Sequence, residues 1–337
     1  MVFTDLLFLF CFLPISVLLY KVAKNIKIQN ILLVVLSLLF YAWGNPVHVI
    51  LLILSILWNY FTALELNEQE DEKARKIILV VAIVVDLLLL GVYKYTGFVM
   101  NILHIQSSVQ IALPVGLSFF TFSELSYLFD VYNKKIKSER SLVKVALFIS
   151  FLPQLTEGPI ARFRSTADDL YNGHKVTYDN FCLGMQRLFW GLFKKMIIAD
   201  RLNILVKTVF QNYNILNGCT IFIGSLAYTI MLYMDFSGII DVVIGIGEMF
   251  KVKIPENFKQ PFFSKSISEF WSRWHISLGS WFKDYIYYPI SLSKPMKKLT
   301  IKLRKILNNH YGPLVSGTIA LFIVWLLNGL WHGAGWT

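Results

Sequence analysis

Seven long apolar runs, joined by short polar or basic connections, constrain this sequence more than any other feature. They cover residues 6–20, 31–43, 47–61, 77–93, 111–129, 221–236 and 314–327. Several approach the roughly 20 residues that a helix needs to cross a bilayer. Only 16% of the 337 residues are charged, whereas an average soluble domain has about 25%. The sequence therefore predicts an all-α, polytopic membrane protein.

The net charge of +11 comes mostly from basic residues in the connections between the apolar runs. Cytoplasmic loops of membrane proteins carry this excess, so the charge needs no nucleic acid partner. With the N-terminus outside, the connections at 21–27, 65–76 and 134–140 fall inside. Beyond residue 160 the alternation breaks down, which predicts re-entrant or interfacial helices. The basic residues between 294 and 305 then predict a cytoplasmic loop.

Prolines and glycines interrupt the apolar sequence around Glu157. Two prolines lie within residues 151–160, where they remove backbone donors and clash with the preceding turn, so an uninterrupted helix is excluded. Such backbone at membrane depth must be buried in protein or line a wet cavity. Glu157 is therefore a candidate supporting residue. An interfacial ion pair with Arg162 or Arg164 is the alternative explanation.

Two carboxylates, Asp235 and Asp241, flank a glycine at the end of an apolar run. They are candidates for a proton path, a metal pair or buried hydrogen-bond anchors. No histidine or cysteine lies near enough in the sequence to complete an obvious metal set, so no metal site is predicted. The preceding residues 186–201 combine basic and aromatic side chains, which predicts a helix at the cytoplasmic interface with snorkelling lysines.

Residues 266–288 are predicted to form the clearest amphipathic helix of the chain. At about 100° per residue, one face is apolar. It contains Ile267, Phe270, Trp271, Trp274, Leu278, Trp281, Phe282 and Tyr285. His275 falls at the seam between this face and the polar one. The pattern leaves two interpretations open for His275, a group facing a cavity or a hydrogen-bonded interfacial histidine.

The last apolar run ends in a second isolated imidazole, His332, which lies between Trp331 and several glycines. Apolar surroundings disfavour a charged imidazole, which suits a neutral base that accepts a proton near pH 7. An ionisable group at membrane depth is a functional candidate by default. A structural histidine at a helix end is the alternative. Asn328 lies one helical turn earlier and is a candidate for orienting the ring by a hydrogen bond.

Five motifs, in this order, resemble the membrane-bound O-acyltransferase family. They are Leu152-Pro153-Gln154 with Glu157-Gly158-Pro159-Ile160, Asp235-Phe236-Ser237-Gly238, Pro255-Glu256-Asn257-Phe258, Phe270-Trp271-Ser272-Arg273-Trp274-His275-Ile276-Ser277-Leu278 and Gly329-Leu330-Trp331-His332-Gly333-Ala334-Gly335-Trp336. The resemblance covers most of the chain and is closest to the bacterial branch that O-acetylates exported polysaccharides such as alginate. Teichoic acid D-alanyltransferases share the Arg-Trp-His and Trp-His-Gly elements.

The resemblance implies a ring of transmembrane helices with re-entrant and interfacial helices. His332 corresponds to the family's catalytic histidine and His275 to its second functional histidine. Their motif neighbours Trp271, Arg273, Trp274 and Trp331 are candidates for supporting or tunnel-lining residues. The implied reaction uses an acyl thioester from the cytoplasm, acetyl-CoA or an acyl-carrier protein, as substrate, and no bound cofactor. The acceptor is a hydroxyl of an exported polysaccharide, reached directly or through an extracytoplasmic relay protein.

The same resemblance implies a multi-pass protein of the bacterial cytoplasmic membrane. It predicts one membrane domain over residues 1–337, with an N-terminal helical bundle at 1–110 and a catalytic core at 111–337, and further spans beyond Thr337. Two other hypotheses remain at this point. A proton-coupled transporter or flippase predicts symmetry between the two halves of the chain, and the sequence shows no internal repeat. The third hypothesis is an inactive scaffold for extracellular acylation partners.

Overall fold

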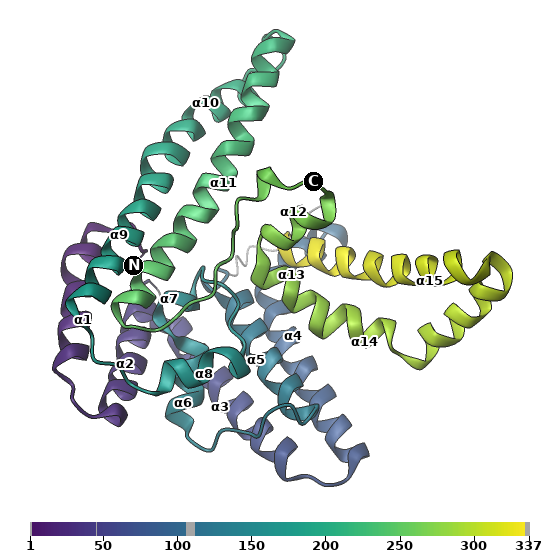
Figure 1. Cartoon of the computed structure of the whole chain (residues 1–337), viewed down its shortest axis with the longest axis horizontal. Coiled ribbons are helices and arrows are strands. Elements are labelled where there is room, and N and C mark those ends of the chain that lie inside the picture. The colour runs from purple at the N-terminus through teal and green to yellow at the C-terminus, as the bar shows by residue number, and fades with distance from the viewer. Residues whose placement is uncertain (1, 45, 106–111, 334–337) are drawn as a thin grey trace. The chain divides into compact units, whose positions relative to one another are not determined.

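The computed structural model describes residues 2–44, 46–105 and 112–333, and all regular elements in these ranges are helices (Figure 1). Five of them are long and apolar enough to cross a membrane. They are α2 (Ile26–Gly44), α3 (Pro46–Glu68), α4 (Glu72–Ile102), α11 (Gly218–Met249) and α15 (Lys294–His332). The all-α, polytopic prediction is confirmed. The motif residues Ala334, Gly335 and Trp336 lie outside the described residues.

Shorter helices connect the long ones. The N-terminal ones are the π-helical turn Phe8–Phe12, α1 (Leu13–Val22), α5 (Leu117–Tyr132), α6 (Leu142–Ser150), α7 (Leu152–Leu155), α8 (Phe163–Tyr171), α9 (Tyr178–Leu192), the π-helical turn Phe193–Ala199 and α10 (Asp200–Gln211). The C-terminal ones are the 3-10 turn Pro261–Phe263, α12 (Ile267–Arg273), α13 (Ile276–Phe282), the π-helical turn Lys283–Tyr287 and α14 (Tyr288–Ser291). The apolar run predicted at 111–129 corresponds to α5, a helix of only 16 residues. This helix starts directly after Gly116, whose backbone is left-handed (φ 77°).

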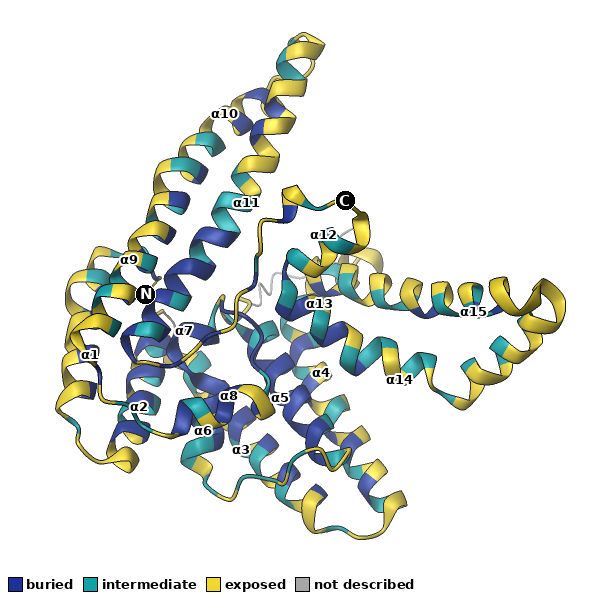
Figure 2. Cartoon of the chain, viewed as in Figure 1, coloured by how far each residue is buried: buried dark blue, intermediate teal, exposed yellow. Residues whose placement is uncertain are grey.

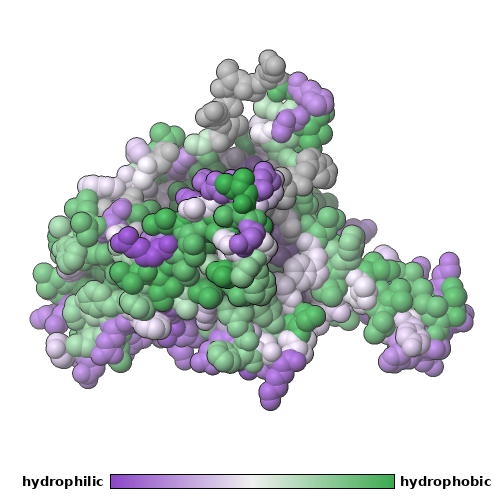
Figure 3. Space-filling view, turned by 90° about the horizontal axis from the view of Figure 1, so that it is seen from above, coloured by the Kyte–Doolittle hydropathy of each residue, from purple (hydrophilic) through white to green (hydrophobic). Residues whose placement is uncertain are grey.

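Large apolar side chains line the outer faces of the long helices, as the exposed positions in Figure 2 and the green surface in Figure 3 show. Val80, Val84, Leu88 and Val92 of α4 are all exposed. Monomeric soluble proteins rarely expose contiguous apolar surface of this kind. Lipid is the medium that covers such faces without a free-energy penalty.

The chain folds into two compact units, each assembled from two separate parts of the sequence. The first contains Met1–Tyr60 and Glu139–Lys259, and the second contains Phe61–Ser138 and Gln260–Thr337. The second unit carries both candidate histidines. The first carries the two aspartates and Glu157.

Glycines set the packing of α9 against α11 in the first unit. A Cβ atom at Gly191 would lie 2.5 Å from the carbonyl oxygen of Gly238, and one at Gly184 would lie 2.6 Å from that of Gly245. The two glycines of each helix are seven residues apart, about two helical turns, so they lie on one face. Small residues at such positions let helix backbones approach closely in a membrane.

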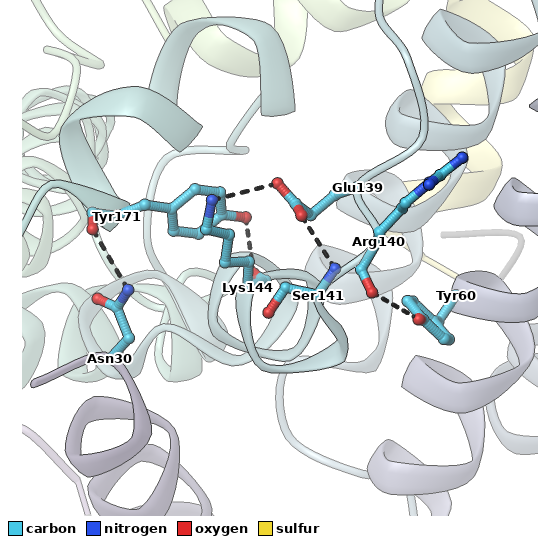
Figure 4. A network of polar contacts seen from close by, with 7 residues as sticks. All are labelled: Asn30, Tyr60, Glu139, Arg140, Ser141, Lys144 and Tyr171. Atoms are coloured by element: carbon cyan, nitrogen blue, oxygen red, sulfur yellow. Dashed lines mark hydrogen bonds and ion pairs between the residues drawn. The ribbon is translucent and has the colours of Figure 1, made fainter. Parts of the chain in front are cut away.

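Polar contacts in the first unit link α3 to the connection before α6, α8 to α6, and α2 to α8 (Figure 4). The hydroxyl of Tyr60, on α3, donates to the carbonyl oxygen of Arg140 at 2.7 Å. The hydroxyl of Tyr171, on α8, donates to the carbonyl oxygen of Lys144 at 2.6 Å, and the Asn30 amide on α2 donates to that of Tyr171 at 3.3 Å. The carbonyls of Arg140, before α6, and of Tyr171, at the end of α8, are thereby satisfied outside regular helical hydrogen bonding.

The predicted interruption at residues 151–160 is confirmed. Helix α6 ends at Ser150, Phe151 has extended backbone (ψ 116°), and α7 is only four residues long. The chain then folds back on itself, because a Cβ atom at Gly158 would lie 2.4 Å from the Cα atom of Gln154. Only glycine fits at that approach.

Residues 294–305 were predicted to form a cytoplasmic loop and are instead the first part of helix α15, while their cytoplasmic position stays a prediction. Ser293 caps this helix by accepting a hydrogen bond from the backbone N–H of Met296. The helix reverses direction at Asn308 (φ 89°, ψ 176°), whose side chain accepts from the backbone N–H groups of His310 and Tyr311. The return helix approaches closely enough that a Cβ atom at Gly312 would lie 2.6 Å from the backbone nitrogen of Arg304.

Candidate active site

His275 lies at a break between two helices, so the prediction of one continuous helix over 266–288 is wrong. Trp274 has extended backbone (φ −102°, ψ 127°), and His275 is left-handed (φ 46°, ψ 52°). The backbone N–H of Trp274 still bonds to Phe270, whereas the next helix begins with Gly279 donating to the carbonyl of His275. A non-glycine residue with positive φ is strained, and only 5% of His275 remains exposed.

The predicted apolar face is buried only after this break. Leu278, Trp281 and Tyr285 are buried, whereas Ile267 of α12 is 80% exposed. The indole N–H of Trp281 donates to the backbone carbonyl of Phe122 at 3.0 Å, and the two rings stack at 4.2 Å. These contacts fix α13 against α5 and thereby fix the position of His275.

Trp331 lies against both candidate histidines. Its ring centroid is 4.6 Å from that of His332 and 6.2 Å from that of His275. Phe122 stacks on the same indole at 5.5 Å, and Phe119 meets it edge-on at 6.0 Å. The structure thus brings together two imidazoles, more than 50 residues apart in the sequence, around one buried tryptophan. His332 is exposed at the end of α15.

The other predicted supporting residues of the second unit make local contacts. The Arg273 guanidinium pairs with the Glu269 carboxylate at 2.6 Å, one turn away on α12. Trp271 packs edge-on against Trp325 of α15 at 4.8 Å, and Trp274 stacks on Phe270 at 5.7 Å. These contacts hold α12 in place and neutralise the arginine.

The predicted hydrogen bond between Asn328 and His332 is wrong, because none exists among residues 2–44, 46–105 and 112–333. The Oδ1 atom of Asn328 is buried and has no hydrogen-bond partner in that part of the chain. The His332 ring lies instead edge-on against Trp331.

Sequence reasoning missed two residues of α4 that contact this site, Lys94 and Tyr95. The Lys94 ammonium donates to the backbone carbonyl of Trp331, lies 3.4 Å from the Ser118 hydroxyl and 5.4 Å from the centroid of the Trp331 ring. The Tyr95 hydroxyl donates to the carbonyl of Leu330 at 2.7 Å. The sequence contained one indication of their importance, a lysine between two tyrosines inside a long apolar stretch that forms a 31-residue helix. An ionisable side chain at membrane depth is a functional candidate by default.

Burial lowers the pKa of His275 to about 3, and the neighbouring His332 acts in the same direction. Desolvation disfavours the charged imidazole. His275 is therefore neutral throughout the physiological range, so one ring nitrogen carries a proton and the other can accept one.

We predict that this neutral state makes stability fall as the pH is lowered. The unfolded chain takes up a proton near pH 6.5, whereas folded His275 does so only near pH 3, so the stabilisation is complete above pH 6.5 and is lost as the pH falls towards 3. From pH 7 to pH 5, His275 alone lowers the free energy of unfolding by roughly 2 kcal/mol. Denaturant titrations in detergent at both pH values should show the loss in the parent and a smaller one in His275→Gln. An equal loss in both proteins would contradict the assignment.

In the first unit, Asp241 belongs to a buried ion-pair cluster. Its carboxylate pairs with the Lys194 ammonium and, at 2.6 Å, with the Arg187 guanidinium, which also pairs with Glu256 at 2.8 Å. The prediction of snorkelling lysines is wrong for Lys194, which is 7% exposed and also donates to the Ser237 hydroxyl at 3.0 Å. Asp241 was a candidate for a proton path, a metal pair or a buried hydrogen-bond anchor, and its contacts are those of a buried anchor.

Asp235 and Glu157 lie near a second lysine. The Lys195 ammonium pairs with Asp235 at 2.7 Å and with Asp200 at 2.8 Å. Glu157 keeps an exposed surface, yet partial desolvation by the surrounding protein raises its pKa, the nearby Asp235 raises it further, and Lys195 opposes both. Glu157 therefore shares its environment with a second acid. In the part of the chain that the structure describes, no three His, Cys, Asp or Glu residues are grouped so that they could hold a metal ion.

Comparison with known proteins places this chain in a family. The model of the membrane-bound O-acyltransferase family matches residues 47–302. A probable alginate O-acetylase of Pseudomonas syringae pv. tomato is 37% identical over 100% of this chain and 63% of its own length. A peptidoglycan O-acetyltransferase of Helicobacter pylori is 32% identical over 100% of this chain and 67% of its own length.

A teichoic acid D-alanyltransferase of Bacillus subtilis is 31% identical over 65% of this chain and 53% of its own length. The chain thus spans slightly less than two thirds of the length of the Pseudomonas relative. The family model covers most of the chain, and two relatives align with all of it at more than 30% identity. The chain therefore belongs to the membrane-bound O-acyltransferase family.

Proposed function

We propose that this chain carries the catalytic histidines of a bacterial membrane enzyme that transfers an acetyl group from a cytoplasmic thioester to hydroxyl groups of an exported polysaccharide. The observation that carries the proposal is the convergence of His275 and His332 on Trp331, with ring centroids 6.2 and 4.6 Å from the indole. The named relatives that match the whole chain are O-acetylating proteins. Transfer from inside to outside requires a multi-pass protein, in agreement with the five apolar helices.

In this reaction neutral His332 accepts the proton of the acceptor hydroxyl while its oxygen attacks the thioester carbonyl carbon. The carbon–sulfur bond of the resulting tetrahedral intermediate then breaks, and the departing thiolate takes up the proton from His332. General base catalysis of this kind contributes about 10²–10⁴-fold in rate. His332 suits this role because its side chain is exposed at a helix end, where an acceptor can reach it.

His275 supports the same step as a neutral donor. Its low pKa, about 3, keeps the ring neutral, so that one of its two nitrogens carries a proton. A preorganised donor at the oxygen that becomes negative in the tetrahedral intermediate stabilises the transition state. The aromatic rings of Phe122 and Trp331 lie on the side of His275, which is 5% exposed, and shield that side of the site from water that would otherwise hydrolyse the thioester.

The donor in this proposal is acetyl-CoA or an acyl-carrier protein, and the acceptor is reached directly or through an extracytoplasmic relay protein. The protein lies in the cytoplasmic membrane with its N-terminus outside. A second candidate is D-alanyl transfer to teichoic acid, which the similarity to the Bacillus subtilis protein favours. Both reactions use the same histidine chemistry on a thioester and differ in the acyl group and the acceptor.

The test follows labelled acyl groups in membranes of cells that express the coding sequence read to its own stop codon. With acetyl-labelled acetyl-CoA, we expect alkali-labile label in exported polysaccharide above the level of membranes without the protein. A parallel sample receives labelled D-alanine and ATP. Label from D-alanine alone would favour the second candidate, and no label from either donor would overturn the acyltransferase proposal for this chain.

A further inference from the structure

We propose that Lys94 and Tyr95 of α4 are positioning residues that hold the end of α15, and with it His332, in the geometry that acyl transfer needs. The importance of that geometry rests on the proposed function. The anchoring itself rests on contacts between two helices of the second unit.

The end of α15 leaves backbone carbonyls that the helix itself cannot satisfy. The last four carbonyl groups of any α-helix lack intrahelical partners, and the interior of a bilayer offers no water to replace them. The backbone N–H of Gly333 donates to the carbonyl of Gly329. The next two carbonyls, those of Leu330 and Trp331, receive their hydrogen bonds from Tyr95 and Lys94.

Two consecutive residues of one helix therefore bind two consecutive carbonyls of the other. Together with the packing of Trp331 on Phe122, the two contacts fix both the rotation and the position of the end of α15. The Lys94 ammonium reaches two further groups, the Ser118 hydroxyl at 3.4 Å and the face of the Trp331 ring at 5.4 Å. His332 follows Trp331 directly, so the contacts act one residue from the imidazole.

A lysine is suited to this place for an electrostatic reason. The C-terminal end of a helix carries a partial negative charge, which a cation stabilises. No carboxylate in the described ranges forms an ion pair with Lys94, and its ammonium bonds to the carbonyl of Trp331 at this helix end. A charge at membrane depth is costly and marks a functional group by default.

The experiment compares Lys94→Met, Lys94→Arg and Tyr95→Phe with Thr96→Val as the matched control. Among the described residues the Thr96 hydroxyl bonds only to Val92 of its own helix, so its removal should leave activity unchanged. We expect kcat for acetyl transfer to fall about 10²-fold in Lys94→Met, since a displacement of about 1 Å costs that much. KM for the donor should change less than threefold. Tyr95→Phe should lower kcat about fivefold, and Lys94→Arg should restore at least a third of the parent kcat.

A second measurement detects the anchoring without any activity. Amide hydrogen exchange in detergent should be faster in the peptide that contains residues 327–333 of Lys94→Met and Tyr95→Phe, and unchanged in Thr96→Val. Unchanged exchange in Lys94→Met, a kcat within twofold of the parent, or an Arg variant no better than the Met variant would overturn the proposal. A parent protein without His332-dependent transfer would overturn the proposed function instead, and the exchange result would still decide the anchoring.

Discussion

Replacing His332 with alanine should lower acetyl transfer by about 10²–10⁴-fold while the protein still inserts at normal abundance. The substitution removes the proposed general base. It should leave the fold intact because the side chain is exposed at the last residue of α15 and its one ring contact in the described part of the chain is with the neighbouring Trp331. The measurement is incorporation of labelled acetyl groups into exported polysaccharide, normalised to the amount of protein in the membrane.

His310→Ala is the matched control for this substitution. His310 is an exposed histidine on the same helix, and its ring packs edge-on against Tyr311, so its loss should change transfer less than twofold. His275→Gln separates the second imidazole from the first, since the amide keeps an N–H donor but has no proton-accepting ring nitrogen. If His332→Ala transfers label as well as the parent, His332 is structural and the mechanism is wrong.

The sequence was sufficient to predict those features that depend on local composition. Long apolar runs predicted the membrane helices, and the two prolines near Glu157 predicted the break between α6 and α7. The break at His275 was missed because no proline or glycine lies at Trp274 or His275 to signal it. Tertiary packing of Trp281 on Phe122 overrides a regular helical pattern there.

Features that depend on contacts between distant segments were not predictable from one sequence. The basic residues at 294–305 predicted a loop, since charge indicates exposure to water but does not exclude a helix. The role of Lys194 was misjudged because its partner, Asp241, lies on another helix. Lys94 was overlooked for the same reason, since the carbonyl that it binds is more than 230 residues away.

Replacing Asp241 with alanine should destabilise the protein by about 3–5 kcal/mol, the usual cost of breaking a buried ion pair by removing one partner. Asp241 is 5% exposed, and the ammonium of Lys194, itself 7% exposed, would lose its carboxylate in an environment that does not solvate it. Gly191 and Gly238 bring α9 and α11 into close contact beside this pair, whereas Arg187, the second partner of Asp241, is 37% exposed. Denaturant titration in detergent, followed by tryptophan fluorescence, gives the free energy of unfolding.

The matched control is Asp200→Ala, which removes a carboxylate from the neighbouring Lys195. Asp200 is 49% exposed, and exposed pairs contribute only about 0–1 kcal/mol. A double variant, Asp241→Leu with Lys194→Met, removes both charges at once and should recover much of the stability lost in Asp241→Ala, because the cost lies in the unpaired ammonium and not in the lost attraction. If the double variant is as unstable as Asp241→Ala, the unpaired ammonium of Lys194 is not the cause of the loss. The carboxylate would then be needed for its second partner, Arg187.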